Sequence, residues 1–186
     1  AELWQPNDSI LQKYTQAFEC DDSGFGGAFG SWYYKNSNRH AQFAAMITRL
    51  DTQVGEIFAK LEEKGLADNT LVIFTSDNGP HEEGGADPDW FNRDGLLRGT
   101  KRSTHEGGIR VPFIVKGPGV PAGTVNDHQL AFYDLMPTLL DYAGLNGDAY
   151  SRKASTDTQY WDGISFNNTL RGNDAEQEKH EFLYWE

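Results

Sequence analysis

The chain has 186 residues, of which 38% are hydrophobic, and this is enough for one domain of ordinary size. Sixteen Lys and Arg against 28 Asp and Glu give a formal net charge of −12, which excludes a general nucleic-acid binder whose whole surface attracts phosphate. The 13% aromatic fraction excludes an intrinsically disordered chain, and a mean hydropathy of −0.64 without a long apolar run excludes a membrane span.

Two helices are predicted in the first third of the chain. A short one begins at Asp8 or Ser9, and its apolar face consists of Ile10, Leu11, Tyr14 and Phe18. A long amphipathic helix begins at about Arg39 and ends at Lys64, because Gly65 is able to adopt the left-handed conformation that closes a helix. Its apolar positions, spaced by steps of one, three and four, are Phe43, Met46, Ile47, Leu50, Val54, Ile57, Phe58 and Leu61.

Strands are predicted after the long helix. The apolar run at 71–75 suits a strand that is buried on both faces, as in parallel sheets. The run at 111–115 is a second predicted strand, since Pro112 near its start is tolerated at a strand entry. A further helix covers 135–143, with Asp134 as its cap, Pro137 in its first turn and Gly144 at its end. The order of helix, strand, long loop, strand and helix indicates an α/β fold with a mainly parallel sheet flanked by helices.

The chain is expected to be part of something longer. We divide it into an irregular N-terminal segment (1–38), an α/β core portion (39–145), and a loop with the start of a C-terminal subdomain (146–186). Residues 182–185 begin another predicted strand, and the sequence ends directly after it, at Glu186. The fold is therefore expected to be incomplete.

A pair of oxygen-bearing side chains directly follows the first predicted strand. Ligands gather at the carboxyl ends of strands in open α/β sheets, and Asp77 and Asn78 occupy such a position. Carboxylate and amide oxygens are the ligands that Ca²⁺ or Mg²⁺ prefers. The alternative is a simple turn, in which Asp77 and Asn78 bond to their own backbone and Gly79 supplies a positive φ.

A long glycine-rich loop follows over residues 79–108, and loops of this length are usually functional or disordered. The densest basic cluster of this acidic chain lies at its end and just beyond, and consists of Arg98, Lys101, Arg102 and Arg110. A cluster of cations beside a divalent ion is the arrangement that binds sulfate or phosphate.

Five motifs occur together in a characteristic order. They are Ser-Asp-Asn-Gly-Pro-His at 76–81, Leu-Arg-Gly-Thr-Lys at 97–101, Glu-Gly-Gly-Ile-Arg-Val-Pro-Phe at 106–113, Asp-Leu-Met-Pro-Thr-Leu-Leu-Asp-Tyr-Ala-Gly at 134–144 and Phe-Leu-Tyr-Trp-Glu at 182–186. With them the chain resembles the C-terminal portion of the sulfatase (arylsulfatase) family, within the alkaline-phosphatase-like superfamily. The resemblance is close over residues 33–145 and looser over the last five.

The resemblance implies roles for individual residues. Asp77 and Asn78 match two ligands of the single Ca²⁺ of the sulfatase site, where Mg²⁺ is the other candidate. Lys101 matches the lysine that binds the sulfate group and assists the bridging oxygen. His81 either contacts substrate or donates a proton, or is a solvated loop histidine. His105 stands where the family often has an aromatic residue, so it faces the substrate or is simply solvated.

Other parts of the sulfatase site are missing from this sequence. The family uses a Cys or Ser in Cys/Ser-x-Pro/Ala-x-Arg, oxidised to formylglycine, whereas Cys20 is followed by Asp-Asp-Ser-Gly. Because Ca²⁺ takes about six to eight oxygen ligands, the two present here are too few. The resemblance implies that the formylglycine belongs to a missing N-terminal half of the same protein, and that this chain alone is inactive.

The parent protein is expected to be a sulfuric ester hydrolase, acting on a sulfate-ester small molecule or a sulfated glycan. A phosphatase, phosphonate hydrolase or phosphodiesterase of the same superfamily is one alternative, although the two-zinc members place Asp-His where this chain has Asp-Asn. A non-catalytic fragment that binds an anion or a partner is another. By resemblance alone, the expected location is the periplasm, the lysosome or the outside of the cell.

Overall fold

The computed structural model describes residues 9–18, 38–81, 89–92, 95–145 and 162–185. The chain divides into two compact units, one of Ala1–Ala67 with Phe74–Phe113 and one of Asp68–Ile73 with Ile114–Glu186. The helices are α1 (Ser9–Ala17), α2 (Arg39–Glu63), α3 (Glu106–Ile109), α4 (Leu135–Tyr142) and α5 (Asn167–Leu170), and the strands are β1 (Val72–Thr75) and β2 (Phe113–Lys116). None of the described helices has the length and apolar character needed to cross a bilayer.

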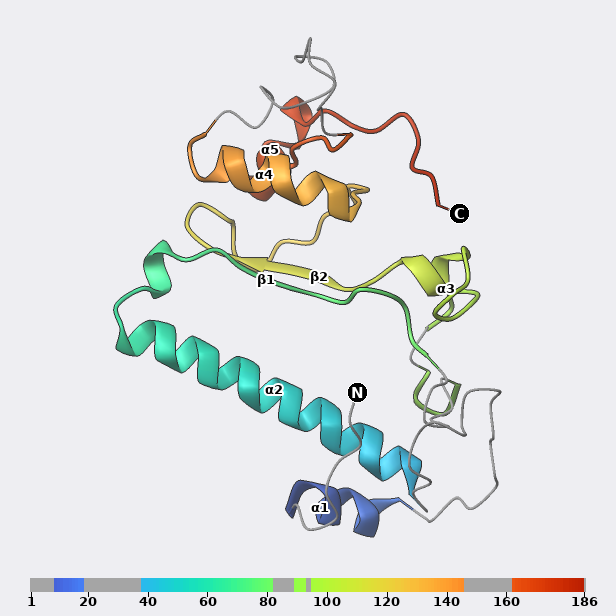
Figure 1. Cartoon of the computed structure of the whole chain (residues 1–186). Coiled ribbons are helices and arrows are strands. Elements are labelled where there is room, and N and C mark those ends of the chain that lie inside the picture. The colour runs from blue at the N-terminus through green and yellow to red at the C-terminus, as the bar shows by residue number, and fades with distance from the viewer. Residues whose placement is uncertain (1–8, 19–37, 82–88, 93–94, 146–161, 186) are drawn as a thin grey trace. The chain divides into compact units, whose positions relative to one another are not determined.

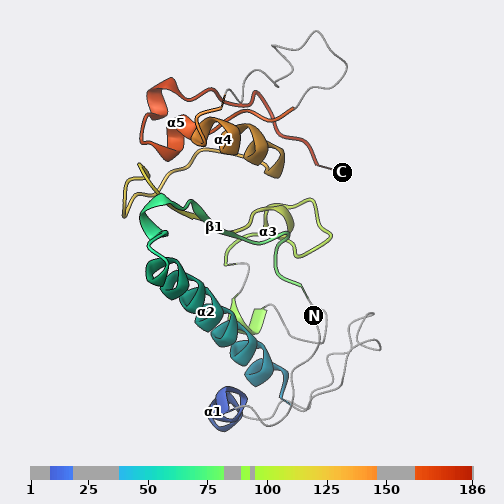
Figure 2. The ribbon, with the colours of Figure 1, turned by 60° about the vertical axis from the view of Figure 1, so that its left-hand side comes forward.

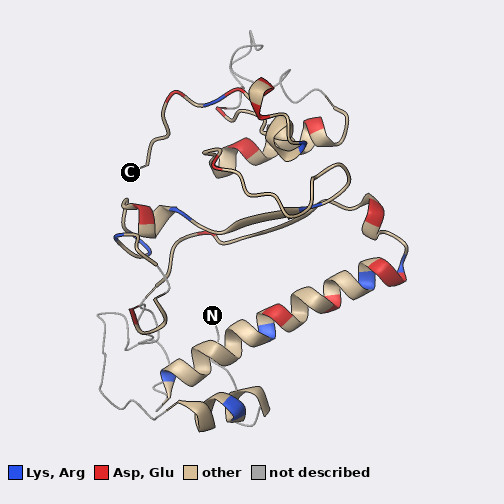
Figure 3. Ribbon diagram, turned by 180° about the vertical axis from the view of Figure 1, so that it is seen from behind, with Lys and Arg blue, Asp and Glu red and all other residues tan. Residues whose placement is uncertain are grey.

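The long helix α2 begins and ends at local signals in the sequence. At its start, the side chain of Asn38 accepts a hydrogen bond from the Ala41 N–H at 3.0 Å. At its end, Gly65 has φ +66°, its N–H donates to Glu62 O, and the Leu66 N–H donates to Leu61 O, which together form a Schellman motif. The prediction of a helix ending at Lys64 and Gly65 is confirmed. Side chains of both charges occur along α2, mostly in its second half (Figure 3).

Helix α1 packs beside the first half of α2 (Figure 2). Ala41 and Ala45 of α2 are fully buried there, because their small side chains let the two helices approach closely. Leu11 of α1 packs against them, and the Tyr14 and Thr48 hydroxyls are hydrogen-bonded at 2.8 Å. The predicted face of α1 is confirmed, with Leu11 buried and Ile10, Tyr14 and Phe18 packed around it.

The apolar stripe that the sequence predicted along α2 is only partly covered. Burial is concentrated on the alanine face that meets α1, whereas Ile47, Leu50 and Ile57 are exposed. At the start of α2, His40 is buried and its ring stacks on that of Trp90, with centroids 4.0 Å apart and planes 9° apart. The periodicity therefore identified the helix correctly but not the face that is buried within this chain.

Strands β1 and β2 are hydrogen-bonded neighbours in a two-stranded sheet (Figure 1). Both predicted strands are confirmed, each within two residues of its predicted ends. The parallel arrangement stays a prediction. The strand predicted over residues 182–185 is wrong for the described part of the chain, since β1 and β2 are the strands found there and an extended segment without a hydrogen-bonded neighbour forms no ladder.

Helix α4 has the predicted extent, and Gly144, with φ +78°, lies just beyond its last residues. The predicted capping role of Asp134 is wrong, because its side chain makes no capping hydrogen bond to α4. The carboxylate of Asp134 is fully buried and instead accepts hydrogen bonds from the N–H groups of Ala131 at 2.7 Å and Ile164 at 2.8 Å. It is also paired with His180 Nε2 at 2.8 Å. One carboxylate therefore holds three segments of the chain together.

Two glycines, one just beyond the end of α2 and one within it, make a direct test of the helix assignment. Gly65 has a positive φ, so Gly65→Ala should lower the free energy of unfolding by about 1 kcal/mol. Gly55 lies within α2 with open space around it, so Gly55→Ala should raise that free energy by about 0.5–1 kcal/mol. Urea unfolding followed by circular dichroism at 222 nm measures both; equal effects of the two substitutions would contradict this account of the C-terminus of α2.

Candidate functional site

The segment that follows β1 carries the predicted Asp-Asn pair. Ser76 Oγ donates a hydrogen bond to Asn78 O at 2.9 Å and Asn78 Nδ2 donates to Gly79 O at 2.8 Å. The latter bond uses the amide nitrogen, so the Asn78 Oδ1 atom is left as an acceptor. The Asp77 side chain is exposed, and it makes no hydrogen bond or ion pair within the described ranges. This pair therefore presents oxygen atoms outward from the end of a strand.

A second loop, residues 98–108, is joined to this segment through its backbone. The Lys101 N–H donates to Pro80 O at 2.7 Å, and the Gly79 N–H donates to Gly108 O at 2.9 Å. The second loop is also closed on itself, since the Gly107 N–H donates to Arg98 O at 2.8 Å. The structure thus brings the backbone of the Asp-Asn segment next to that of the lysine, although the two segments are about 20 residues apart in sequence.

Glycines make this approach possible. Gly79, Gly107 and Gly108 are buried, and the backbone of Gly79 lies against that of Gly107. An ideal Cβ built on Gly79 would overlap the Gly107 carbonyl group and lie 2.9 Å from its carbon atom. Gly79 is not among the described residues with positive φ, so the interpretation that it supplies a left-handed turn is wrong. It is glycine because there is no space for a side chain.

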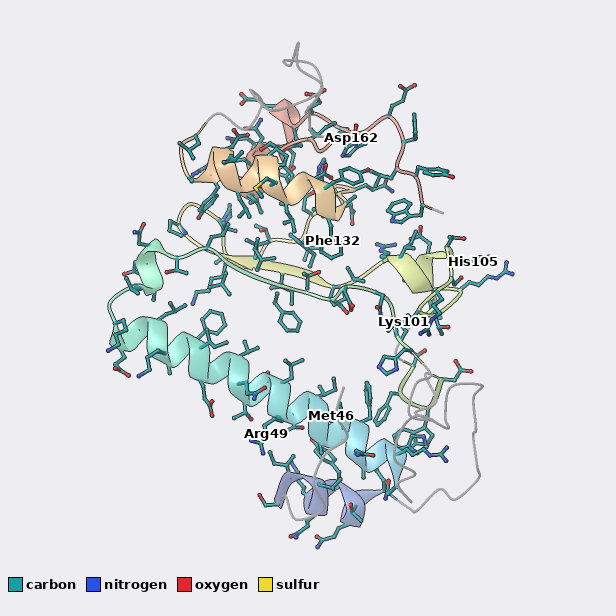
Figure 4. All side chains as sticks on the ribbon, in the orientation of Figure 1. Met46, Arg49, Lys101, His105, Phe132 and Asp162 are labelled. Atoms are coloured by element: carbon teal, nitrogen blue, oxygen red, sulfur yellow. The ribbon has the colours of Figure 1, made fainter. Side chains whose placement is uncertain are left out.

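The side chains of Lys101 and His105 come from the same loop, next to α3 (Figure 4). Lys101 is half-buried and His105 is exposed. Ser103 Oγ accepts a hydrogen bond from the His105 N–H at 3.2 Å and lies 2.9 Å from His105 Nδ1. Because a hydroxyl has one proton and two lone pairs, Ser103 Oγ can bond to Nδ1 as donor or as acceptor while it accepts from the backbone. His105 is thus held by its own loop.

The remaining predicted residues lie on the same two loops. His81 is half-buried and immediately follows Pro80, whose carbonyl binds the Lys101 N–H. Arg110 pairs with Glu106 at 3.6 Å across the short helix α3, as expected for residues that fix the loop. Both side chains are exposed, so this pair stabilises the loop only slightly.

The donor set fits part of a calcium site. Asp77 supplies a carboxylate and Asn78 an amide oxygen, and both are hard ligands of the kind that Ca²⁺ binds. Within the described ranges, no three His, Cys, Asp or Glu side chains gather closely enough to hold a metal ion. The pair fits as part of a coordination shell, and additional oxygen ligands are required to complete it.

Sequence reasoning missed two features of the site. The first is the contact of Gly79 with Gly107 and Gly108, and the second is the Ser103 hydroxyl that holds His105. The glycines and the serine are visible in the sequence. Their partners are not, since the spacing of the two loops depends on the tertiary fold.

A match to a protein-family model shows to which family this chain belongs. The model of the sulfatase family matches residues 6–145. The chain belongs to the sulfatase family. This sulfatase chain is 34% identical over 181 residues to steryl-sulfatase of Mus musculus, covering 95% of this chain and 26% of that protein. It is 36% identical over 135 residues to N-acetylgalactosamine-6-O-sulfatase of Bacteroides thetaiotaomicron, covering 69% of this chain and 25% of that protein.

Solved structures agree with the family. The sulfatase chain is similar to Ps i-CgsB, crystallised with k-i-k-neocarrahexaose, at a TM-score of 0.58 and 30% identity over 74% of this chain and 28% of that one. It is equally similar to the PsFucS1 sulfatase from Pseudoalteromonas sp., with a TM-score of 0.58 and 30% identity over 77% and 27% of the two chains. The sulfatase chain thus spans about a quarter of the length of the relatives it matches.

The hydrogen bond between Ser103 and His105 can be tested directly. Ser103→Ala should change the ratio of the Nδ1–H and Nε2–H tautomers of neutral His105, because Nδ1 loses its hydroxyl partner. The ¹⁵N chemical shifts of the histidine ring measure both fractions. His180, which pairs with Asp134, is the internal control, and an unchanged tautomer ratio at His105 would contradict the hydrogen bond to Ser103.

Proposed function

We propose that this chain is the C-terminal part of a sulfatase that hydrolyses a sulfate ester to an alcohol and sulfate. The observation that carries the proposal is the joining of the Asp77–Asn78 segment to the Lys101 loop by two backbone hydrogen bonds, in a chain of the sulfatase family. Divalent-cation ligands and a cationic side chain on neighbouring segments are the groups that bind a sulfate ester and stabilise the charge that develops as its S–O bond breaks.

Asp77 and Asn78 are proposed as two of the Ca²⁺ ligands, with Mg²⁺ as the less suitable ion. Support comes from the Asn78 amide, whose nitrogen is bonded to Gly79 O so that its oxygen is available. When bound, the ion supplies a Lewis acid that polarises the sulfate oxygens. What these residues themselves contribute is negative charge and a fixed direction of two oxygen atoms.

Lys101 is proposed to bind the sulfate group and to stabilise the negative charge that develops on the bridging oxygen as the S–O bond breaks. Its backbone, bonded to Pro80, supports a fixed starting point for the long side chain. His81, next to Pro80, is proposed to contact the substrate or to donate a proton to the leaving alcohol. His105 is proposed as a substrate-facing residue whose ring direction is set by Ser103.

The rest of the site is proposed to come from the N-terminal half of the same protein. That half would provide the formylglycine and the remaining metal ligands, so this chain alone is expected to be inactive. It would also extend β1 and β2 into a mainly parallel sheet flanked by helices. The division of the chain into the segments 1–38, 39–145 and 146–186 remains part of this proposal.

The substrate class is proposed from relatives. Steryl-sulfatase and N-acetylgalactosamine-6-O-sulfatase are named for a steroid and a sugar sulfate, so a sulfate-ester small molecule or a sulfated glycan is the proposed substrate. The proposed location is periplasmic, lysosomal or secreted, and one relative, an extracellular sulfatase homologue of Drosophila melanogaster, supports the secreted alternative.

Lys101 gives the test of reaction type. In a longer polypeptide that contains this chain, Lys101→Ala should lower kcat/KM for an aryl sulfate by about 100- to 1,000-fold, because charge on the leaving oxygen loses its partner. Lys64→Ala, which removes an exposed lysine at the end of α2, is the matched control and should leave kcat/KM unchanged. Phosphate-ester turnover equal to sulfate-ester turnover would favour a phosphatase of the same superfamily instead.

Calcium binding by the chain itself tests whether the site is incomplete. Isothermal titration calorimetry of this chain with Ca²⁺ should give binding no tighter than the millimolar range, because Asp77 and Asn78 supply only two of about six to eight ligands. Asp77→Ala should abolish what binding remains. A micromolar dissociation constant for the unmodified chain would show that its metal site is already complete.

A further inference from the structure

The contact between the two site loops consists of backbone atoms on both sides. We name Gly79, Gly107 and Gly108 the glycine contact. An ideal Cβ on Gly107 would overlap the Gly99 carbonyl oxygen and lie 2.8 Å from Arg98 O. One on Gly108 would overlap Ser103 O and lie 2.6 Å from Thr100 O. All the atoms that block these positions belong to the backbone, so rotation of a side chain cannot make room.

The glycine contact lies between the groups assigned to the sulfate. On one side, Gly79 directly follows Asp77 and Asn78. On the other, Gly107 and Gly108 contact residues 98–103, which include Lys101. The Gly107 N–H donates a hydrogen bond to Arg98 O, and Gly108 lies close to the backbone of Thr100 and Ser103. A methyl group on Gly79 must therefore push the first segment away from the second loop, and one on Gly107 or Gly108 must deform the second loop itself, whose backbone carries the Gly108 carbonyl and the Lys101 N–H that bond to the first segment.

Two hydrogen bonds cross this contact, and each loop donates one of them. The Gly79 N–H donates to the second loop at Gly108 O, and the Lys101 N–H donates to the first loop at Pro80 O. Both bonds depend on the short distance that the glycines permit. Separation of the loops by about an ångström would stretch both beyond normal hydrogen-bond length.

We propose that Gly79, Gly107 and Gly108 are positioning residues of the sulfate site, which fix the Lys101 loop against the Asp77–Asn78 segment. The catalytic consequence rests on the proposed function, because it assumes that Lys101 and Asp77 act on one sulfate group. The effect of these glycines on the position of the two loops does not rest on that assumption. A cation displaced by about an ångström from its productive place costs roughly 100-fold in rate, so the contact matters beyond stability.

The geometric part is tested on this chain by amide hydrogen exchange measured with NMR. Gly107→Ala should raise the exchange rates of the Gly79 and Lys101 amides by about tenfold or more, because both hydrogen bonds weaken. The Phe166 amide, bonded to Thr138 Oγ1 at 2.9 Å, should change by less than about twofold. Gly55→Ala is the matched glycine control, since its site is open. Unchanged exchange at Gly79 and Lys101 in the Gly107→Ala variant would overturn the proposal.

The unmodified chain provides a second measurement in case Gly107→Ala does not fold. If one contact holds both bonds, the Gly79 and Lys101 amides should open together, with the same dependence of their exchange rates on low urea concentrations. Opening free energies that differ between these two amides, with different urea slopes, would also overturn the proposal.

The catalytic part is tested by a double-mutant cycle in a longer polypeptide that contains this chain. Gly107→Ala should lower kcat/KM for an aryl sulfate about 100-fold when Lys101 is present and less than about threefold in the Lys101→Ala background. A glycine that acts only on stability would reduce activity equally in both backgrounds, and that result would overturn the positioning role. Absence of any sulfate-ester turnover would instead refute the proposed function, while the exchange measurement would still judge the glycine contact.

Discussion

The backbone contact of Gly79 with Gly107 is the constraint on which the geometry of the candidate site depends. It allows the segment after β1 and the loop before α3 to share two hydrogen bonds, from Gly79 to Gly108 and from Lys101 to Pro80. Because the contact contains no side chains, no charged side chain takes part in it, although the backbone N–H of Lys101 forms one of the two bonds. The net charge of −12 therefore says little about how these loops are held together.

The parts of the fold that could be predicted from sequence depend on local interactions. Gly65 and Gly144 end α2 and α4 through hydrogen bonds to residues within the preceding turns, so a short sequence window contains the whole signal. The parts that could not be predicted depend on distant partners. Asp134 stands at the correct place for a cap, but its carboxylate binds Ile164 and His180, which are 30 and 46 residues away. No periodicity or capping rule reveals such a choice.

The same distinction applies to the candidate site. Asp77, Asn78, His81, Lys101 and His105 were identified by residue type and by the order of five motifs, and this order agrees with membership of the sulfatase family. Their roles stay proposals. The alternative of a turn with positive φ at Gly79 is wrong, although an Asp-Asn-Gly sequence is typical of such a turn. The decisive fact is the carbonyl of Gly107 against it, and sequence alone does not place two loops in contact.

Each compact unit contains one arrangement that links distant segments, and the two arrangements differ in chemistry but not in their need for space. Around Asp134, a buried carboxylate is stabilised because N–H donors from Ala131 and Ile164 and the ring of His180 satisfy its oxygens. That arrangement is sensitive to removal of the carboxylate. It is also sensitive to volume, because a Cβ on Gly163, next to Ile164, would overlap the Tyr133 carbonyl oxygen and lie 3.0 Å from Asp134 Cα. Around Gly79 no charged side chain takes part, and a single added methyl group would overlap the Gly107 carbonyl group. The scaffold of the candidate site is therefore sensitive to volume and not to charge, although two of the residues that it carries, Asp77 and Lys101, are charged.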